Sequence, residues 1–404
     1  MRQHIMDDVV VKTKANIERF GDQFPHVSLN DQYSLNDNND WTDGFWSGLL
    51  WLCYEYSGDE AFKEAARRTV ASFRNRLDNH VALDHHDIGF LYSLSSKAQW
   101  MIEGDEEAKC LTIEAADVLL NRWRPELGII QAWGPKGHPE NGGRIIIDCL
   151  MNLPLLYWAH QVTGEQKYYD VAVAHAEKSR RFLVRGDDSS YHTFYFDQET
   201  GDALHGGTHQ GYFDGSTWTR GQAWGIYGFA LSYHYTNNKA FLETSIRLAK
   251  YFLERLPEDL VVYWDFNAPV NAETKRDSSA SAVTACGIHE LLKVLPADHP
   301  DREALARGLE QTMKGLAEGY STVNKPDAQG LLERGSYSVR GGESPDDYMI
   351  WGDYYYMEAL MRIEKGHKGY WYDSAVRRVP PEDRKRGVDH NGIANEELFD
   401  DRQR

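Results

Sequence analysis

Hydrophobic and polar residues recur with helical periodicity along most of the chain, and similar short turns interrupt the pattern. At each turn an aromatic-rich, apolar stretch stops, and a charged, amphipathic stretch begins after a capping Gly or Asn and an acidic first turn. Four of these turns lie at Gly58-Asp59, Gly104-Asp105, Gly164-Glu165 and Asn237-Asn238. The repetition predicts helical hairpins that each combine one buried and one amphipathic helix.

The spacing of these stretches predicts about twelve helices. The apolar helices are expected to begin near residues 43, 86, 144, 220, 279 and 353, and the amphipathic helices near residues 4, 59, 106, 165, 239 and 300. We predict an all-α fold, an (α/α)6 barrel in which six hairpins close into a toroid with the apolar helices lining the centre. An open solenoid is the alternative, but long, unequal connections before the inner helices favour the closed form.

Two segments, 185–219 and 259–278, are too long to be simple connectors, so we expect long loops or short strands that cover one end of the toroid. We assign residues 1–376 to a single (α/α)6 domain. Residues 377–404 form a charged, proline-bearing C-terminal tail, whose composition is typical of disordered segments.

The chain is acidic, with 62 Asp and Glu against 44 Lys and Arg and a formal net charge of −18. This balance argues against nucleic-acid and anionic-membrane partners, which need a basic face. The four cysteines are widely spaced and lack zinc-site spacing, so we expect buried free thiols in a reducing compartment. The opening stretch MRQHIMDDVVVKTK lacks the apolar region of a signal peptide, and no apolar stretch is long enough to cross a membrane. We therefore expect a cytoplasmic enzyme or binding protein.

The chemically unusual residues precede or open the six inner helices. These motifs are WTDGFWSG (41–48), DHHDIGF (84–90), NGGRIIIDC (141–149), STWTRGQAWG (216–225), RDSSASAVT (276–284) and SPDDYMIWGDYYY (344–356). In an up-and-down toroid all six lie at the same end, so they converge on one rim, as an active site requires.

Two carboxylates stand out at this rim. Asp148 lies inside the apolar run IIIDCLMNLPLL, where burial raises the pKa of a carboxyl and a second nearby carboxylate raises it further. A carboxyl that is protonated near neutral pH is a general acid. The alternative for Asp148 is to cap loop N–H groups, and the alternative for Asp87 in DHHDIGF is to cap the following helix.

Other rim residues have two interpretations each. Arg220 either pairs with a helix carboxylate or holds an anionic group. Zinc ligation by His85 and His86 together with His192 or His209 lacks a supporting spacing, so substrate hydrogen bonding is preferred. Six tryptophans are individually typical of a core, but together they suggest that some stack on a sugar ring: Trp41, Trp46, Trp133, Trp218, Trp224 and Trp351.

The glycine-rich stretch HGGTHQG (205–211) lacks a phosphate-loop lysine and a strand–helix context, which argues against a nucleotide site. Close approach of the backbone to a ligand is a better interpretation of Gly206 and Gly207.

From about residue 10 to about residue 373, the chain resembles the unsaturated glucuronyl hydrolases of glycoside hydrolase family 88. The resemblance rests on long motifs that include NDNNDWTDGFWSG, LDHHDIGFLYSL, IIQAWGPKG, NGGRIIIDCL, RGDDSSYHTFYFD, DGSTWTRGQAWGIYGFAL, RGSYSVRGG and SPDDYMIWGDYYYMEAL. It implies an (α/α)6 barrel, in agreement with the helix pattern. It also implies a substrate that carries a 4,5-unsaturated uronic acid at its non-reducing end, with no cofactor and no metal.

By this resemblance, Asp148 is the proton donor and then the base in a hydration of the C4=C5 double bond, and Asp87 is its catalytic partner. The resemblance also implies a set of contacts to the unsaturated sugar: Trp41, His86, Trp133, His192, Gly206, Thr208, Gln210, Arg220, Trp224 and Ser338. Asp84 and His85 are expected to shape the loop instead.

Three alternatives remain at this stage. They are an unsaturated rhamnogalacturonyl hydrolase, an inverting glycosidase that cleaves a saturated bond, and a non-catalytic sugar-binding toroid. The sequence does not choose among fragments of gellan, xanthan, chondroitin, hyaluronan and heparin, and it does not determine the oligomeric state. Lys136 in GPKGHPE is a candidate contact to the leaving sugar.

Overall fold

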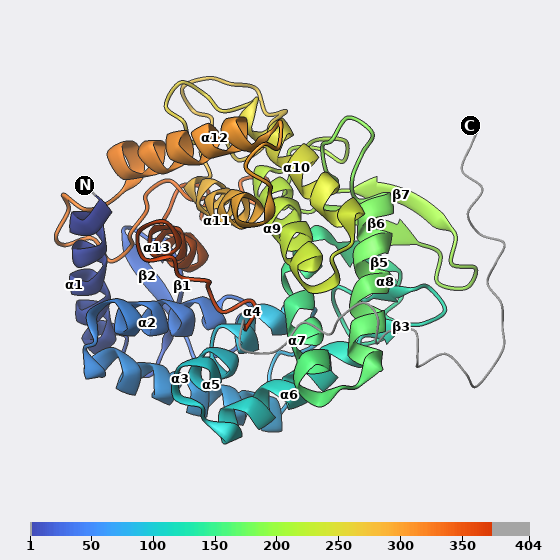
Figure 1. Ribbon diagram of the computed structural model, residues 1–404, viewed down its shortest axis with the longest axis horizontal. Coiled ribbons are helices and arrows are strands. Elements are labelled where there is room, and N and C mark those ends of the chain that lie inside the picture. The colour runs from blue at the N-terminus through green and yellow to red at the C-terminus, as the bar shows by residue number, and fades with distance from the viewer. Residues whose placement is uncertain (1, 374–404) are drawn as a thin grey trace.

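The computed structural model describes residues 2–373, so the predicted tail and its boundary at residue 376 lie outside the described residues. An inner ring of helices surrounds the centre of the molecule, and each helix contacts the next until the last returns to the first (Figure 1). The ring consists of α2 (Asp43–Ser57), α4 (Ile88–Ser93), α7 (Leu153–Thr163), α9 (Thr219–Thr236), α11 (Ser278–Val294) and α13 (Ile350–Lys365).

An outer ring of helices covers the inner one (Figure 1). Its members are α1 (Arg2–Phe20), α3 (Glu60–Asp78), α6 (Glu106–Leu120), α8 (Gln166–Phe182), α10 (Lys239–Leu253) and α12 (Arg302–Gly315). Five outer helices pack against the inner helix that precedes them, whereas α1 packs against α13 and completes the last hairpin. The predicted closed (α/α)6 barrel is therefore confirmed.

Three of the four turns named above combine a left-handed terminator with a capping side chain, whereas Glu165 in the remaining turn makes no capping hydrogen bond. Gly58 ends α2 in the left-handed conformation, with φ at 70°, and its N–H donates to the carbonyl of Tyr54. The next residue, Asp59, then caps α3 by accepting a hydrogen bond from the N–H of Ala61. A left-handed terminator followed directly by a capping side chain fixes a sharp reversal, which keeps the two helices of a hairpin antiparallel.

The third inner helix begins later than expected. Residues Arg144–Ile146 form strand β5 and Ile147–Met151 form a 3-10 helix, so α7 begins at Leu153 and not near residue 144. The run of three β-branched isoleucines favours an extended backbone, and Pro154 in the first turn of α7 favours a helix start there.

The second inner helix is also interrupted, because α4 ends at Ser93 and α5 (Ser96–Glu103) continues beyond it. At the break, the side chain of Ser95 donates to the carbonyl of Leu91.

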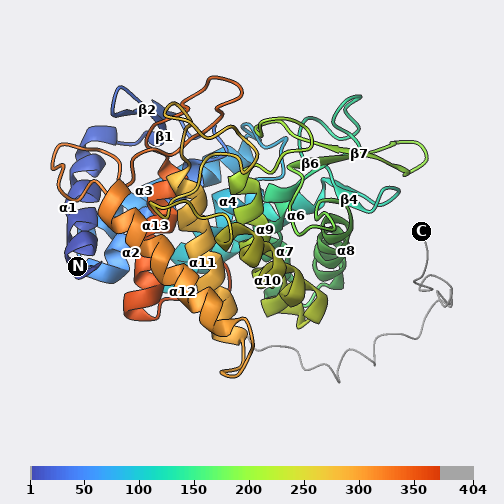
Figure 2. The same cartoon turned by 90° about the horizontal axis from the view of Figure 1, so that it is seen from above.

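Short antiparallel strands and long loops gather at one end of the barrel, as predicted for residues 185–219 and 259–278 (Figure 2). Strand β5 pairs with β6 (Thr193–Phe196), which pairs with β7 (Ala203–Gly207). Two hairpins add β1 (Phe24–Leu29) with β2 (Gln32–Asn36), and β3 (Trp123–Arg124) with β4 (Ile129–Ile130). This end contains the segments that enter the inner helices.

Aromatic side chains fill the centre and seal the opposite end. Trp371 is fully buried, and its ring lies parallel to that of Tyr355 with centroids 6.2 Å apart. Its carbonyl accepts hydrogen bonds from Lys97 Nζ and from the hydroxyl of Tyr235, near the C-terminal end of α9, both at 2.8 Å. Since the inner helices end here, the closed end lies opposite the loops.

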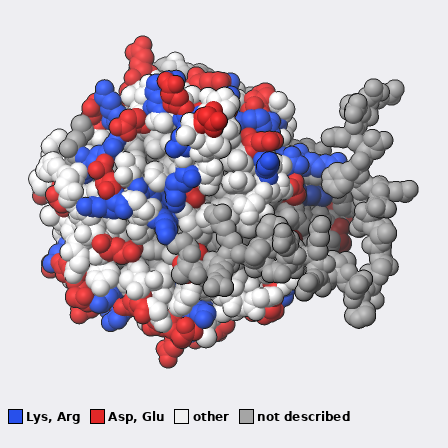
Figure 3. Space-filling view, in the orientation of Figure 1, with Lys and Arg blue, Asp and Glu red and all other residues white. Residues whose placement is uncertain are grey.

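No helix within residues 2–373 has the length and apolar character needed to cross a membrane. On the face that Figure 3 shows, acidic and basic side chains are intermingled and neither sign dominates. The cysteines are unpaired, and Cys53, Cys149 and Cys286 are buried as expected. Cys110 is exposed on the outer helix α6, which corrects the expectation for that residue.

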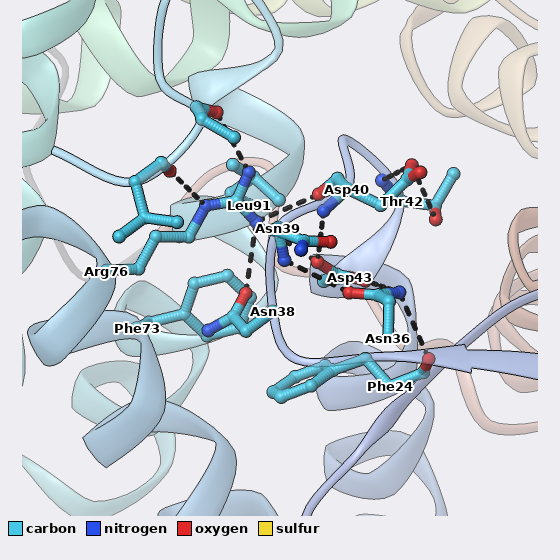
Figure 4. Close-up of polar contacts among 12 residues, drawn as sticks. Phe24, Asn36, Asn38, Asn39, Asp40, Thr42, Asp43, Phe73, Arg76 and Leu91 are labelled. Atoms are coloured by element: carbon cyan, nitrogen blue, oxygen red, sulfur yellow. Dashed lines mark hydrogen bonds and ion pairs between the residues drawn. The ribbon is translucent and has the colours of Figure 1, made fainter.

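A buried ion pair ties two of the entering loops together (Figure 4). Asp43 opens α2 and Arg76 lies on α3, and Nη1 of Arg76 is 3.1 Å from Oδ2 of Asp43 with both side chains buried. Arg76 also donates to the carbonyl of Asp40, ahead of α2, and to those of Val81 and Ala82, ahead of α4. The guanidinium therefore connects the motif WTDGFWSG to the motif DHHDIGF.

We expect Arg76→Met to lower the free energy of unfolding by about 3–5 kcal/mol, because it leaves the Asp43 carboxyl buried without its cation. Denaturant unfolding followed by circular dichroism measures the change.

Arg74→Met on the same helix is the matched control. Arg74 pairs with Glu114 at 2.6 Å, but both side chains are exposed. Its loss should lower the free energy of unfolding by less than about 1 kcal/mol. Equal effects of the two substitutions would contradict the role given to the buried pair.

Candidate active site

A cavity of about 150 Å³ opens at the loop end of the barrel. Both predicted catalytic carboxylates and five of the ten predicted sugar contacts line it. The lining residues are Trp41, His86, Asp87, Trp133, Ile146, Asp148, His192, His209, Gln210 and Tyr337. Three of the six inner-helix motifs, WTDGFWSG, DHHDIGF and NGGRIIIDC, contribute residues to this lining.

Asp87 immediately precedes α4, but its side chain makes no capping hydrogen bond, so the capping alternative is wrong. Its Oδ1 accepts a hydrogen bond from Asn152 Nδ2 at 3.3 Å and lies 3.4 Å from His86 Nε2. Burial, followed by the charge of Asp148, raises the pKa of Asp87 well above its usual range. Burial and the neighbouring carboxyl therefore both favour the protonated form of Asp87.

Asp148 lies in the 3-10 helix between β5 and α7. Its Oδ2 is buried without a hydrogen-bond partner among the described residues, and His192 Nε2 lies 3.8 Å away. Burial raises the pKa of Asp148 to about 7, although the charge of Arg220 opposes the shift. The carboxyl therefore exchanges a proton near neutral pH, as a group that acts first as acid and then as base must.

Asn152 holds the two acidic segments together. Its Nδ2 donates to Oδ1 of Asp87 at 3.3 Å and to the carbonyl of Asp148 at 3.2 Å, and its Oδ1 accepts from the N–H of Phe90 at 2.8 Å. A Cβ at Gly89 would lie 2.5 Å from the Cα of Asn152, so only glycine permits this approach. The motifs did not single out Asn152, although it is a polar residue in an apolar run, four positions after Asp148.

The histidines around the acids are neutral. Nδ1 of His192 accepts the N–H groups of His209 at 3.0 Å and Gln210 at 3.2 Å, so its proton lies on Nε2, which faces Asp148. Burial lowers the pKa of His192 and His86 well below the usual value, and lowers that of His85 to about 3. These rings therefore act as oriented hydrogen-bonding groups and not as cations.

His85 supports the loop, as expected. Its Nδ1 accepts the N–H of Asp87 at 3.1 Å, and Nε2 donates to the carbonyl of Ala82 at 2.8 Å. Because Arg76 binds the same carbonyl, His85 links Asp87 to the buried ion pair. His86 differs, because its Nδ1 is buried without a partner among the described residues while its ring lines the cavity.

Of the two roles considered for Arg220, the structure shows pairing with a helix carboxylate. It forms a buried ion pair with Asp277, and its Nη2 donates to the carbonyl of Tyr337 at 2.9 Å. The guanidinium lies over the rings of Trp218 and Trp351, with distances of 4.4 Å and 5.2 Å to the ring centroids. It thereby positions the loop that carries Tyr337, and it does not itself line the cavity.

Four further predicted contacts also lie behind the lining. Trp224 is fully buried beneath Phe90, and its Nε1 has no partner among residues 2–373. A side chain at Gly206 would point at the ring of Tyr191, away from the cavity. Thr208 Oγ1 lies 3.3 Å from Nδ1 of His192, and Ser338 accepts the N–H of Gly341.

Two of the six tryptophans discussed above, Trp41 and Trp133, line the cavity. The other four belong to the core: Trp46, Trp218, Trp224 and Trp351. Within residues 2–373 there is no group of three or more His, Cys, Asp or Glu side chains placed to hold a metal ion.

Three lining residues were not predicted as contacts: Ile146, His209 and Tyr337. Each lies within the motifs quoted for the resemblance or in HGGTHQG, one or two positions from a predicted residue. Residue spacing did not indicate which side chains of these loops face inward.

Comparisons with known proteins place the chain in a family of glycoside hydrolases. The family model of Glycosyl Hydrolase Family 88 matches residues 16–371. The chain is 63% identical over 374 residues to the unsaturated glucuronyl hydrolase of Bacillus sp. (strain GL1), covering 92% of this chain and 99% of that protein. It is 47% identical over 357 residues to the unsaturated chondroitin disaccharide hydrolase of Streptococcus agalactiae serotype III (strain NEM316), covering 88% and 89%.

Solved structures agree. The unsaturated glucuronyl hydrolase of Bacillus sp. GL1, described as responsible for the degradation of glycosaminoglycan, superposes with a TM-score of 0.91 at 62% identity, covering 93% of this chain and 100% of that chain. A mutant of the Streptococcus agalactiae enzyme complexed with dGlcA-GalNAc6S superposes with a TM-score of 0.82 at 43% identity, covering 92% and 93%.

The Asp148 carboxyl should make stability depend on pH. Its folded pKa of about 7 exceeds its unfolded value of 3.8, so the folded state binds the extra proton between these pH values. Stability is therefore lost as pH rises through this window. We expect Asp148→Asn to raise the free energy of unfolding by about 1–3 kcal/mol at pH 8 and to leave it nearly unchanged at pH 4. Urea unfolding at the two pH values checks this, and an unchanged or lower stability at pH 8 would contradict it.

Removing the Asn152 amide should raise the pKa of Asp87 further, since that hydrogen bond favours the ionised carboxyl. In Asn152→Ala we expect the pKa of Asp87 to move further upward, since the ionised carboxyl loses a charge-assisted hydrogen bond worth about 1.5–3 kcal/mol. NMR titration of protein labelled at the aspartate carboxyl carbons measures the shift. A downward shift would show that Asn152 does not stabilise the charge.

Proposed function

Because this chain belongs to Glycosyl Hydrolase Family 88, we propose that it is an unsaturated glucuronyl hydrolase acting on lyase-generated oligosaccharides, including those derived from glycosaminoglycans. Its substrates carry a 4,5-unsaturated uronic acid at the non-reducing end, and it releases that residue from the remaining saccharide. The observation that carries this proposal is the protonatable carboxyl of Asp148, placed in a cavity beside Asp87.

The reaction is a hydration. Asp148 donates its proton to C4, and the electrons of the C4=C5 bond form the new C4–H bond and leave an oxocarbenium centre at C5 and the ring oxygen. Water then adds to C5, and the Asp148 carboxylate accepts the proton that this water loses. The product is a hemiketal, which opens to a ketone, and the exposed hemiacetal at C1 releases the neighbouring sugar.

The surrounding residues have supporting roles. Asp87 binds ring hydroxyls, and its own raised pKa limits the negative charge beside the donor. The Nε2–H of His192 faces the Asp148 oxygen that exchanges the proton, which favours a water position between them. Trp41 and Trp133 supply flat surfaces for the ring, and His86 and Gln210 supply polar atoms at the lining.

The remaining predicted contacts act mainly through these residues. Thr208 and Gly206 keep His192 and its strand in place, and Arg220 and Ser338 order the segment that carries Tyr337. Trp224 forms the base on which the lining rests. We propose that they reach substrate only where it penetrates beyond the lining residues.

We also propose that the protein works in the cytoplasm. Four unpaired cysteines, one of them exposed, support a reducing compartment. Its substrates would then be short oligosaccharides that lyases have already cut.

The decisive experiment mixes purified protein with unsaturated disaccharides made by chondroitin, hyaluronate and gellan lyases and follows the ultraviolet absorbance of the conjugated C4=C5 bond. We expect the wild type to remove this absorbance and Asp148→Asn to lose at least about 1,000-fold in kcat, since the proton donor of the rate-limiting step is gone. The pH profile should fall as pH rises through about 7, because Asp148 must be protonated.

The alternatives predict other results. Free sugar without loss of absorbance would mean direct glycosidic cleavage. Activity confined to unsaturated rhamnogalacturonan fragments would identify the rhamnogalacturonyl reaction. No change with any substrate would favour a sugar-binding protein, which should tolerate Asp148→Asn.

A further inference from the structure

Arg144 is a buried cation without a neutralising partner. Its residue is 7% exposed, and it forms no salt bridge with any carboxylate of the described residues. Within residues 2–373 its side chain donates one hydrogen bond, to Oδ1 of Asn141 at 3.4 Å, and its Nε is buried without a hydrogen-bond partner. Burying a guanidinium in this way is costly unless something else satisfies it.

The other buried cations do not share this state. Lys97 and Arg122 donate to main-chain carbonyls at 2.8–3.0 Å. Five have a carboxylate partner in residues 2–373, namely Lys12, Arg76, Arg124, Arg220 and Arg362. The unsatisfied cation is therefore particular to Arg144.

Arg144 is not itself a lining residue of the cavity, but it lies beside two residues that are, Ile146 and Trp133. It lies on β5 two residues before Ile146, which lines the cavity, so the two side chains leave the same face of the strand. Two residues of strand span roughly 6.6 Å, about the length of one sugar ring. The guanidinium lies over the ring of Trp133 at 4.3 Å from its centroid, and Trp133 is itself a lining residue.

The aromatic surroundings hold the guanidinium flat without neutralising it. Tyr195 lies directly across the strand pair, with its ring centroid 5.1 Å from Arg144. Trp133 contacts His209 in turn, with ring centroids 5.1 Å apart. The charge of Arg144 is felt at the lining, because after burial it is the largest factor that lowers the pKa of His192 and of His209.

We propose that Arg144 is a specificity-determining residue that binds an oxyanion of the saccharide, at the side of the cavity formed by Trp133. The inference rests on the function proposed above. The oxyanion is either the carboxylate of the unsaturated uronate or a sulfate on the sugar next to it, and both match a planar guanidinium that offers parallel N–H groups. Lys136, the basic residue first considered for this role, is exposed, and its charge acts on Glu126 instead.

The net charge of −18 makes such a residue useful. An anionic saccharide must approach an acidic protein and enter a cavity that holds two carboxyls. A cation already desolvated beside Trp133 offsets this repulsion, and it needs no carboxylate partner that would compete with the ligand.

The test compares Arg144→Met and Arg144→Lys with the wild type on three substrates. These are an unsulfated unsaturated chondroitin disaccharide, its sulfated counterpart, and the methyl ester of the unsulfated one. For the substrate group that Arg144 binds, we expect Arg144→Met to raise KM about 10- to 100-fold, with kcat changed less than about 3-fold. Arg144→Lys should recover part of the loss, since it keeps the charge but not the planar stacking.

The three substrates distinguish the two oxyanions. A penalty on both free acids that is absent for the methyl ester identifies the uronate carboxylate. A penalty on the sulfated disaccharide alone identifies the sulfate. An equal KM increase on all three substrates, or none on any, overturns the proposal and makes Arg144 a support for Trp133.

Arg124→Met is the matched control. Arg124 is a buried arginine on β3, in a different sheet, and it pairs with Glu126. It should show no dependence on the substrate's anionic groups.

Binding is also measured by calorimetry in the Asp148→Asn background, with and without Arg144→Met, so the readout does not require turnover. Wild-type protein that binds but does not hydrate would refute the proposed function while leaving the role of Arg144 testable. Identical affinities of the two proteins for all three saccharides would refute the role of Arg144.

Discussion

The structure depends on keeping two carboxyls buried side by side. Each of Asp87 and Asp148 loses hydration in the cavity, and the charge of Asp148 adds to the burden on Asp87. Such an arrangement persists only where the surrounding backbone prevents the two acidic segments from moving apart. Gly89 and Asn152 provide that constraint, because the backbone of one segment lies against the side chain of the other. The helical ring supplies the rigidity, since both segments enter adjacent inner helices, α4 and α7.

The electrostatics around the acids follow from this arrangement. Charged histidines would favour the ionised carboxyls and lower their pKa values, whereas the neutral rings of His85, His86 and His192 leave them raised. Arg220 is already neutralised by Asp277, so its influence on Asp148 is moderated. Arg144, beside Trp133, has no carboxylate partner among the described residues. The interior of the cavity is thus suited to proton transfer, and the anion that we propose for Arg144 would bind on the side formed by Trp133.

The sequence predicts the order of the helices well, because neighbouring residues determine where each helix ends and the next begins. Gly58 and Asp59 determine a turn wherever they occur, and the same rule applies at Gly104 and Asp105. The prediction fails at residues 144–152, where helical amphipathicity and β-branched side chains compete and strand pairing with β6 decides the outcome. Asn152 and Tyr337 escaped notice because their roles depend on contacts across more than sixty residues of chain. The sequence named both possible roles of Arg220 but could not choose between them, because its partner Asp277 lies on another hairpin.

The aromatic packing around Trp371 limits which part of a polysaccharide chain can reach the active site. A ring of helices with an open centre would let a chain thread through, whereas here Tyr355, Phe90 and Trp371 block the axis beneath the site. Only a chain end fits such a blind pocket, and the products leave by the route through which the substrate came. We therefore expect catalysis to be distributive. Each turnover begins with a new encounter, which matches short fragments better than intact polysaccharide.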